Sequence, residues 1–292
     1  MSRLHSVFAL LVCLIWSGNF VASKFGMQYF TPFMFTALRF AIVAVLLVPF
    51  VPRPNKKQFL QLLLLATAFG VLHFGLILAS LYKGLDIAGC AIAAQMGVPF
   101  SCILGALFLQ DNLGWKRSMG MAVSFVGMFI VAGTPNVLEN MLGFILALGA
   151  AFSWAVGNLL TKRLASLSVF QMLGWMSLLA VPQLLAISWF TESNAWKPLV
   201  EAPLPIWLFV SYTALGSTIV AYGLWYFLLK RYPISYVAPY SLLTPLFSIA
   251  LGQIFFVEQL TWHILLGGAL TIGGVAVIVI RRPKTVMLGK PE

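Results

Sequence analysis

Ten apolar segments follow one another along the chain, and short polar stretches separate them. Each segment is roughly 18 to 25 residues long, which is enough to cross a bilayer as an α-helix. Prolines and charged residues fall between the segments, as in the stretch from Pro52 to Lys57. The pattern predicts an all-α integral membrane protein with ten transmembrane helices, at about residues 4–24, 31–51, 58–82, 87–110, 115–133, 138–161, 168–190, 204–229, 234–257 and 261–281.

The chain also contains an internal repeat. The stretch W-S-G-N-F-V-A-S-K from Trp16 to Lys24 returns as W-A-V-G-N-L-L-T-K from Trp154 to Lys162, and Asp111 is matched in the same way by Glu258. Five spans per half is an odd number, so the second copy crosses the membrane in the opposite direction to the first. We therefore expect two inverted five-helix repeats at residues 1–133 and 138–282, a connecting turn at 134–137 and a cytoplasmic tail at 283–292.

Composition and charge support a membrane protein and predict its orientation. The chain is 61% hydrophobic and 9% charged, whereas a soluble domain has about a quarter of its residues charged. With the N-terminus inside, all Lys and Arg residues except Lys24, Lys83, Lys197 and Arg39 face the cytoplasm. Basic loops are retained on that side, so we expect both termini in the cytoplasm. The net charge of +11 then reports topology, and no nucleic-acid partner is expected.

Short motifs with informative order and spacing are spread over nearly the whole chain. They are Trp16-x-x-Asn19 with Lys24, Leu38-Arg39-Phe40, Ala150 to Asn158 with Lys162, Thr218 to Gly223, Val237 to Pro245, and Glu258-x-Leu260-Thr261. Together they resemble the drug/metabolite transporter superfamily, specifically EamA-type carriers, and most of all the bacterial exporters of O-acetylserine and cysteine. Asp111 departs from the family pattern, which usually has Glu there. The resemblance implies a ten-helix basket around a central cavity and export of a small metabolite across the inner membrane.

Two ionisable side chains inside the spans are candidates for solute binding, because unpaired polar groups in hydrocarbon are costly. Arg39 lies roughly 12 Å into the second span at 1.5 Å per residue. It is suited to anchor a substrate carboxylate, or alternatively to pair with helix-end carbonyls. His73 lies near the middle of the third span and can take up a proton or act as a neutral hydrogen-bonding group. Asp and Glu are confined to helix ends and loops, so His73 is the first candidate if transport is proton-coupled.

Amide and aromatic side chains near the repeat motifs complete the predicted binding site. Asn19, Asn158 and Gln95 can both donate and accept hydrogen bonds, which suits a zwitterionic solute; amide bonds between helices are the alternative. The aromatic candidates for the cavity are Trp154, Tyr222 and Tyr240, with simple packing as the alternative.

Prolines interrupt the fourth and ninth spans at corresponding places. Pro99 and Pro245 are related by the repeat, and Pro239 adds a second interruption in the ninth span. A proline inside a span removes one helix hydrogen bond and clashes with the preceding turn. Paired interruptions of this kind point to a binding site between repeats, so we expect both helices to bend at the cavity and to take part in gating. Kinking without solute contact is the alternative.

The function predicted from the sequence is secondary transport: export of amino acids or related small metabolites by alternating access, without ATP. No G-x-x-x-x-G-K-[ST] motif is present, so no nucleotide-binding loop is expected. The alternatives are a broad-specificity drug, metabolite or nucleobase carrier, a non-transporting subunit, or a lipid-moving protein. An enzyme is not expected, because the histidines are scattered and the carboxylates lie in loops. No cofactor or metal is predicted; the expected partners are a small-molecule substrate and membrane lipids.

Overall fold

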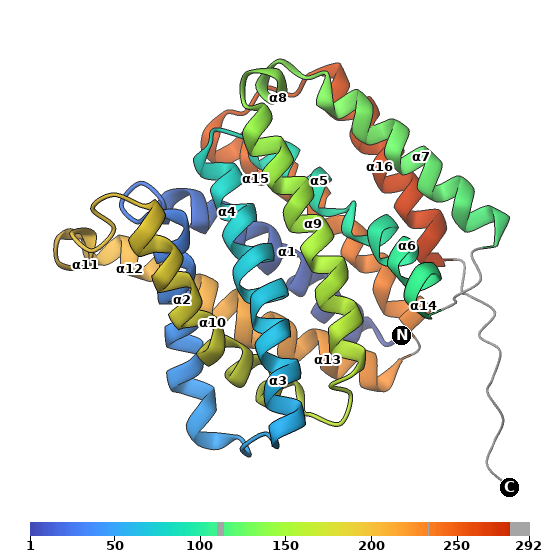
Figure 1. Ribbon diagram of the computed structural model, residues 1–292. Helices are drawn as coiled ribbons and strands as arrows, with labels where there is room; N and C mark the ends of the chain where they lie inside the picture. Colours follow the sequence, from blue (N-terminus) through green and yellow to red (C-terminus); the bar gives the residue numbers. More distant parts are fainter. Residues whose placement is uncertain (110–113, 233, 281–292) are drawn as a thin grey trace, which may run out of the picture.

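The structure is a computed structural model, and it describes residues 1–109, 114–232 and 234–280. Within these ranges all the regular secondary structure is helical, and the long helices pack side by side as a bundle (Figure 1). Asp111, Arg281, Arg282 and the tail at 283–292 lie outside the described residues, and so does the match of Asp111 with Glu258. The described part of the chain confirms the prediction of an all-α membrane protein.

The first half of the chain supplies five spans, and its polar residues mark where helices begin. Asn55 and Gln58 form a reciprocal capping box at the start of α3. Asp86 caps α5 by accepting a hydrogen bond from the Gly89 N–H. The elements are α1 (Arg3–Gly26), α2 (Pro32–Leu47), η1 (Val48–Phe50), α3 (Lys56–Leu65), η2 (Ala66–His73), α4 (Phe74–Tyr82), α5 (Ile87–Ala94), α6 (Gly97–Leu109) and α7 (Trp115–Ala132).

The second half follows the same order of elements. A short helix, α8 (Pro135–Glu139), leads into it. Ser168 caps the start of α10 by accepting a hydrogen bond from the Gln171 N–H. The elements are α9 (Met141–Lys162), α10 (Val169–Thr191), α11 (Pro198–Glu201), α12 (Leu204–Ser211), η3 (Tyr212–Val220), α13 (Ala221–Arg231), α14 (Ile234–Val237), η4 (Ala238–Leu242), α15 (Leu243–Phe256) and α16 (Trp262–Ile280).

Nine helical stretches within the described ranges are long and apolar enough to span a membrane. The predicted span that is missing from these nine is the fifth, at 115–133, and it corresponds to α7, which is 18 residues long. Its first turn contains Lys116 and Arg117, and these two charges lower the hydropathy of the segment. Because α7 lies along α16 (Figure 1), the arrangement agrees with ten spans.

Contacts between the two halves follow a twofold pattern. Two spans of the first half pack on the spans to which the repeat relates them. The second span, α2, packs on the seventh, α10, and the fifth, α7, packs on the tenth, α16. The remaining contacts come in exchanged pairs. The first span (α1) packs on the eighth (α12, η3 and α13) and ninth (α15), while the sixth (α9) packs on the third (η2 and α4) and fourth (α5 and α6). With an odd number of spans in each half, this pattern is the one that inverted repeats produce.

Both halves contain a π-helical segment at equivalent positions. The segment η2 interrupts the third span at Ala66–His73, and η3 interrupts the eighth span at Tyr212–Val220. The Thr218 hydroxyl donates to the carbonyl of Thr213, five residues back. Such wide turns are uncommon and are concentrated at functional sites. These two segments carry His73, Ser217 and Thr218 into the middle of the bundle.

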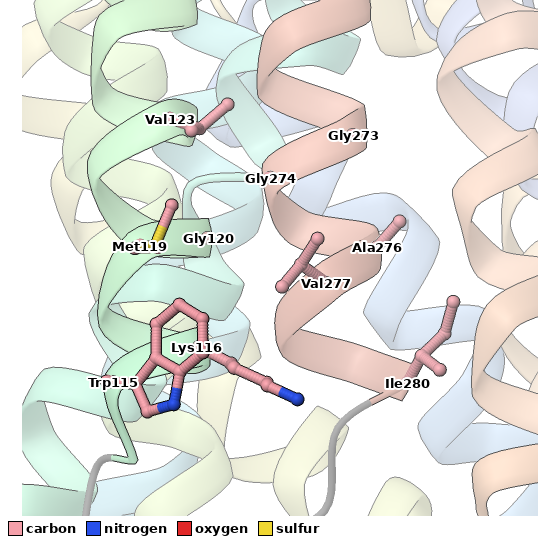
Figure 2. A pocket seen from close by; sticks show the side chains of 10 residues that line it. All are labelled: Trp115, Lys116, Met119, Gly120, Val123, Gly273, Gly274, Ala276, Val277 and Ile280. Atoms are coloured by element: carbon pink, nitrogen blue, oxygen red, sulfur yellow. The ribbon is translucent and has the colours of Figure 1, made fainter.

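Glycines allow α7 and α16 to pack with their backbones in contact. A Cβ on Gly120 would come within 2.7 Å of the Gly274 carbonyl oxygen, and one on Gly127 within 2.6 Å of the Gly267 carbonyl oxygen. Close approach through small residues is typical of helix contacts in membranes. A groove of about 490 Å³ runs beside this contact and ends at Trp115 and Lys116 (Figure 2).

Candidate functional site

A central cavity of about 200 Å³ lies between the two halves. Seven of the ten spans line it, and α7, α10 and α16 contribute no lining residue. The groove of Figure 2 is larger, but among the described residues that line it Lys116 is the only charged one, and the rest are apolar or glycine. A solute site needs a few convergent polar groups in a mostly apolar cavity, and the central cavity meets this condition.

Arg39 is the charged group of the cavity, and its side chain is almost completely buried at 1% exposure. Its Nε donates to Thr218 Oγ1 at 2.9 Å, and its Nη1 donates to Asn19 Oδ1 at 3.2 Å. The guanidinium also lies 4.3 Å from the centre of the Phe74 ring. These contacts orient the guanidinium, but all of them are with neutral groups.

Arg39 has no carboxylate partner within the described ranges. The ion pairs found there join Lys24 to Glu258 and Lys197 to Glu201. A buried charge without a counter-ion is unfavourable. Arg39 therefore provides an unneutralised positive charge at the wall of the cavity, which would attract an anionic group of a solute.

Three other polar groups of the cavity lining make no hydrogen bond within the described structure. Among the described residues, Trp16 Nε1, Ser23 Oγ and Thr244 Oγ1 are buried and make no hydrogen bond. Gln95 also lines the cavity, at the point where the fourth span is interrupted. Buried polar groups are normally hydrogen-bonded, so these groups are available to a polar solute.

His73 lines the cavity together with Trp154. Its Nδ1 lies 2.9 Å from the carbonyl oxygen of Ala150. Because a carbonyl oxygen can only accept, Nδ1 must carry a hydrogen, and a neutral ring then leaves Nε2 as an acceptor. The ring packs against Trp154 at 5.0 Å between centroids. This geometry fits the neutral hydrogen-bonding alternative for His73 and leaves one nitrogen able to bind a proton.

The interrupted fourth and ninth spans both contribute residues to the cavity lining, although Pro99, Pro239 and Pro245 are not among the lining residues. The fourth span breaks between α5 and α6, where the Val98 N–H donates to the Gln95 carbonyl in place of the missing N–H of Pro99. The ninth span is tightened into η4, which contains Pro239, before Pro245 in the first turn of α15.

Side chains of α1 donate hydrogen bonds to two backbone carbonyl groups of the ninth span, close to these interruptions. Cys13 Sγ donates to the Tyr240 carbonyl at 3.0 Å, and Ser17 Oγ donates to the Thr244 carbonyl at 2.8 Å. These bonds couple the first span to the ninth at the level of the cavity.

A charged cluster lies between the central cavity and the end of the bundle that carries α8. Lys24 Nζ is 2.8 Å from Glu258 Oε1, and the ammonium lies 4.4 Å from the centre of the Phe256 ring. Glu258 also accepts hydrogen bonds from the backbone N–H groups of Ile87 and Ala88 at the start of α5. Lys24 thus forms an ion pair across the two halves, a role that its position in the last turn of α1 did not reveal.

The structure brings most of the predicted site residues together. Asn19, Arg39, His73, Gln95, Trp154 and Tyr222 all line the central cavity. Asn158 and Tyr240 are not in that lining: Asn158 donates to Ser101 Oγ at 3.4 Å, and Tyr240 packs near Ala9 and Val237. Sequence reasoning missed the lining residues Ser23, Ser217, Ser241 and Thr244. Small hydroxyl residues are common within spans, so the sequence held no signal that separated these four from the others.

Comparison with known proteins identifies the family. The model of the EamA-like transporter family matches residues 4–133 and 141–280. A probable amino-acid metabolite efflux pump of Escherichia coli is 33% identical, over 99% of this chain and 100% of the relative. A probable amino-acid metabolite efflux pump of Salmonella typhimurium is 32% identical over 96% of both chains.

One solved crystal structure shares the fold, with a TM-score of 0.64 at 18% identity over 95% of this chain and 96% of that chain. The two matches to the family model each cover one five-span half. These two matches agree with the packing of two related halves. The chain is a multi-pass membrane protein and belongs to the EamA-like transporter family.

Proposed function

We propose that this transporter exports amino acids or closely related small metabolites by alternating access, without ATP. The observation that carries the proposal is the buried guanidinium of Arg39 in the wall of the cavity, which has neutral partners within the described ranges. A solute carboxylate would supply the missing charge through a strong, charge-assisted hydrogen bond. The two relatives named as probable amino-acid metabolite efflux pumps support the same class of solute.

The size of the cavity favours a small solute over a drug. Pockets for drug-sized ligands measure roughly 300 to 1,000 Å³, whereas this cavity measures about 200 Å³. Gln95 and the unpartnered hydroxyl groups of Ser23 and Thr244 are suited to the amino end of a zwitterion. A broad-specificity drug carrier would need a larger and less polar chamber.

The packing of the two halves supports alternating access. Each half places the same spans against the other half, in exchanged pairs. Rocking one half on the other therefore opens the cavity first to one side of the membrane and then to the other. We place the protein in the inner membrane with both termini in the cytoplasm, because this orientation keeps the basic loops inside. If protons drive the cycle, His73 is the group in the cavity that binds them.

A ligand comparison on the purified protein tests the proposal. An amino acid and the amine that lacks only its carboxylate are compared for their effect on the melting temperature. We expect the amino acid to raise it, because a ligand that binds only the folded state stabilises that state, and the amine to have little effect. Arg39→Gln should abolish the difference, whereas Lys197→Gln, an exposed charge, should preserve it.

Transport in liposomes provides the second part of the test. Vesicles that contain the protein should accumulate labelled amino acid faster than empty vesicles, without ATP. Equal stabilisation by the amino acid and the amine, together with equal uptake by loaded and empty vesicles, would refute the proposal.

A further inference from the structure

We propose that Lys24, Glu258 and the first turn of α5 form the gate that closes the central cavity toward the α8 end of the bundle. This inference rests on the alternating-access function proposed above and names the contact that must break in each cycle. In Figure 1, α8 lies at the opposite end of the bundle from the N-terminus. With the N-terminus inside, this is the outer gate.

The cluster separates two cavities. Ser23 and Ala91 line the central cavity. The next residue on α1, Lys24, lines a second cavity of about 400 Å³ together with Asp86 and Glu258. The two cavities have no lining residue in common. A solute that leaves the central cavity toward the α8 end therefore has to pass the ion pair.

Glu258 holds elements of the first half from a position in the second half. Its carboxylate pairs with Lys24 at the end of α1 and accepts both from Ile87 N at 2.9 and 3.0 Å and from Ala88 N at 3.3 Å. A carboxylate at a helix N-terminus is stabilised by the free N–H groups and by the helix dipole. Gly252 makes room for this carboxylate, because a Cβ there would lie 2.5 Å from Glu258 Oε2.

A second carboxylate of the second half also binds the start of a first-half helix at this end of the bundle. Glu192 accepts hydrogen bonds from Thr31 Oγ1 and from the backbone N–H groups of Phe33 and Met34 at the start of α2. At the opposite end, the described contacts between the halves are neutral: Gln171 and Trp175 both donate to the Pro52 carbonyl. Among the described residues, the contacts between the halves that involve a carboxylate are thus concentrated at the α8 end.

Cysteine accessibility tests the gate without any solute. Ala94→Cys places a thiol in the wall of the central cavity, and a membrane-impermeant methanethiosulfonate is added to spheroplasts or to inverted vesicles. Hydrogen bonds to charged groups contribute about 1.5 to 3 kcal/mol, and 1.4 kcal/mol corresponds to a factor of ten. Glu258→Gln and Lys24→Met should therefore speed labelling in spheroplasts by roughly tenfold or more, with no change in inverted vesicles.

The chain offers a matched control at the same end. Lys197 and Glu201 form an exposed ion pair with 3.5 Å between the charged atoms, and Glu201→Gln should leave the labelling rate unchanged. Native Cys90 is fully buried in the core. In protein that retains Ala94, the labelling rate of Cys90 therefore reports whether a gate substitution has loosened the fold.

Two results would overturn the proposal. One is a labelling rate at position 94 that neither Glu258→Gln nor Lys24→Met alters from either side of the membrane. The other is faster labelling of Cys90 together with position 94 in both variants, because the ion pair would then hold the fold instead of a gate. Since labelling needs no substrate, these results are independent of the liposome assay, which tests the transport function itself.

Discussion

Two basic side chains that each contact both halves of the molecule have opposite environments. Arg39 lies in the wall of the central cavity and is bonded to neutral groups in the described structure. Lys24, in contrast, is paired with Glu258, and a second carboxylate, Asp86, lines the same outer cavity. The difference separates two tasks: an unneutralised cation attracts a solute, whereas a neutralised one holds the two halves of the protein together.

The largest expected effect is on transport by the Arg39 variant. Arg39→Gln removes the charge that would bind a carboxylate, so we expect kcat/KM for an amino acid to fall roughly 10- to 100-fold, as expected for the loss of one charged hydrogen bond. Lys24→Met should mainly alter kcat and leave the apparent affinity nearly unchanged. Rates measured in liposomes over a range of solute concentrations check both expectations. Similar losses of affinity in the two variants would erase the distinction between them.

The energetic coupling between Lys24 and Glu258 should be the next largest effect. Their side chains are 29% and 7% exposed, so solvent screens the pair only partly, and we expect a coupling energy of about 1 kcal/mol. A double-mutant cycle with Lys24→Met and Glu258→Gln, followed by unfolding in detergent, measures it. The exposed pair Lys197 and Glu201 should give a value close to zero in the same experiment. Additive effects at both pairs would show that Lys24 and Glu258 are not coupled.

Asp86 gives the outer cluster a pH dependence. Burial raises the pKa of Asp86 from 3.8 to about 6; the hydrogen bond from the Gly89 N–H opposes this shift, and the charge of Glu258 adds to it. The folded state then binds a proton more tightly than the unfolded state does. This contribution to stability is present below pH 4 and is lost as the pH rises to about 6.

The corresponding measurement compares melting temperatures of the wild type and Asp86→Asn between pH 4 and pH 7. The wild type should lose stability relative to Asp86→Asn as the pH rises through this range, with a plateau above about pH 6. Arg39→Gln should leave this difference intact. Parallel curves for the wild type and Asp86→Asn would assign the titration to another group.

Much of the fold and part of the site could be predicted from the sequence, because both depend on features that are local in the chain. Apolar length predicts the spans, and the repeat of the Trp16 motif at Trp154 predicts two related halves. Both tryptophans line the cavity. Arg39, His73 and Gln95 could be selected because polar groups inside a membrane span are expensive and need a reason to be there.

The remaining features depend on packing between distant segments. The partner of Lys24 is 234 residues away in the chain, and only the tertiary structure brings it close. The π-helical segments η2 and η3 contain no proline themselves, so no helix-breaking residue within them marks the wide turns. The repeat also misleads at one place: Asn158 is equivalent to Asn19, yet only Asn19 lines the cavity. The equivalent helices α1 and α9 therefore do not present the same positions to the cavity.

The smallest effects are expected at Asn158 and Tyr240, which the sequence placed in the site and the structure places outside the lining. Asn19, which does line the cavity, is the reference for both. Asn19→Ala removes the acceptor that orients Arg39 Nη1 and should lower kcat/KM by roughly tenfold, as expected for about 1.5 kcal/mol. Asn158→Ala, whose amide bond to Ser101 is long at 3.4 Å, should change it by less than about twofold, an effect within the range of surface-like substitutions. Tyr240→Phe should behave in the same way, because its ring packs with Ala9 and Val237. Measuring all three variants in one liposome assay decides whether the cavity seen in this state also serves the rest of the cycle. Large losses at Asn158 and Tyr240 would mean that these side chains enter the site only when the opposite end of the bundle closes.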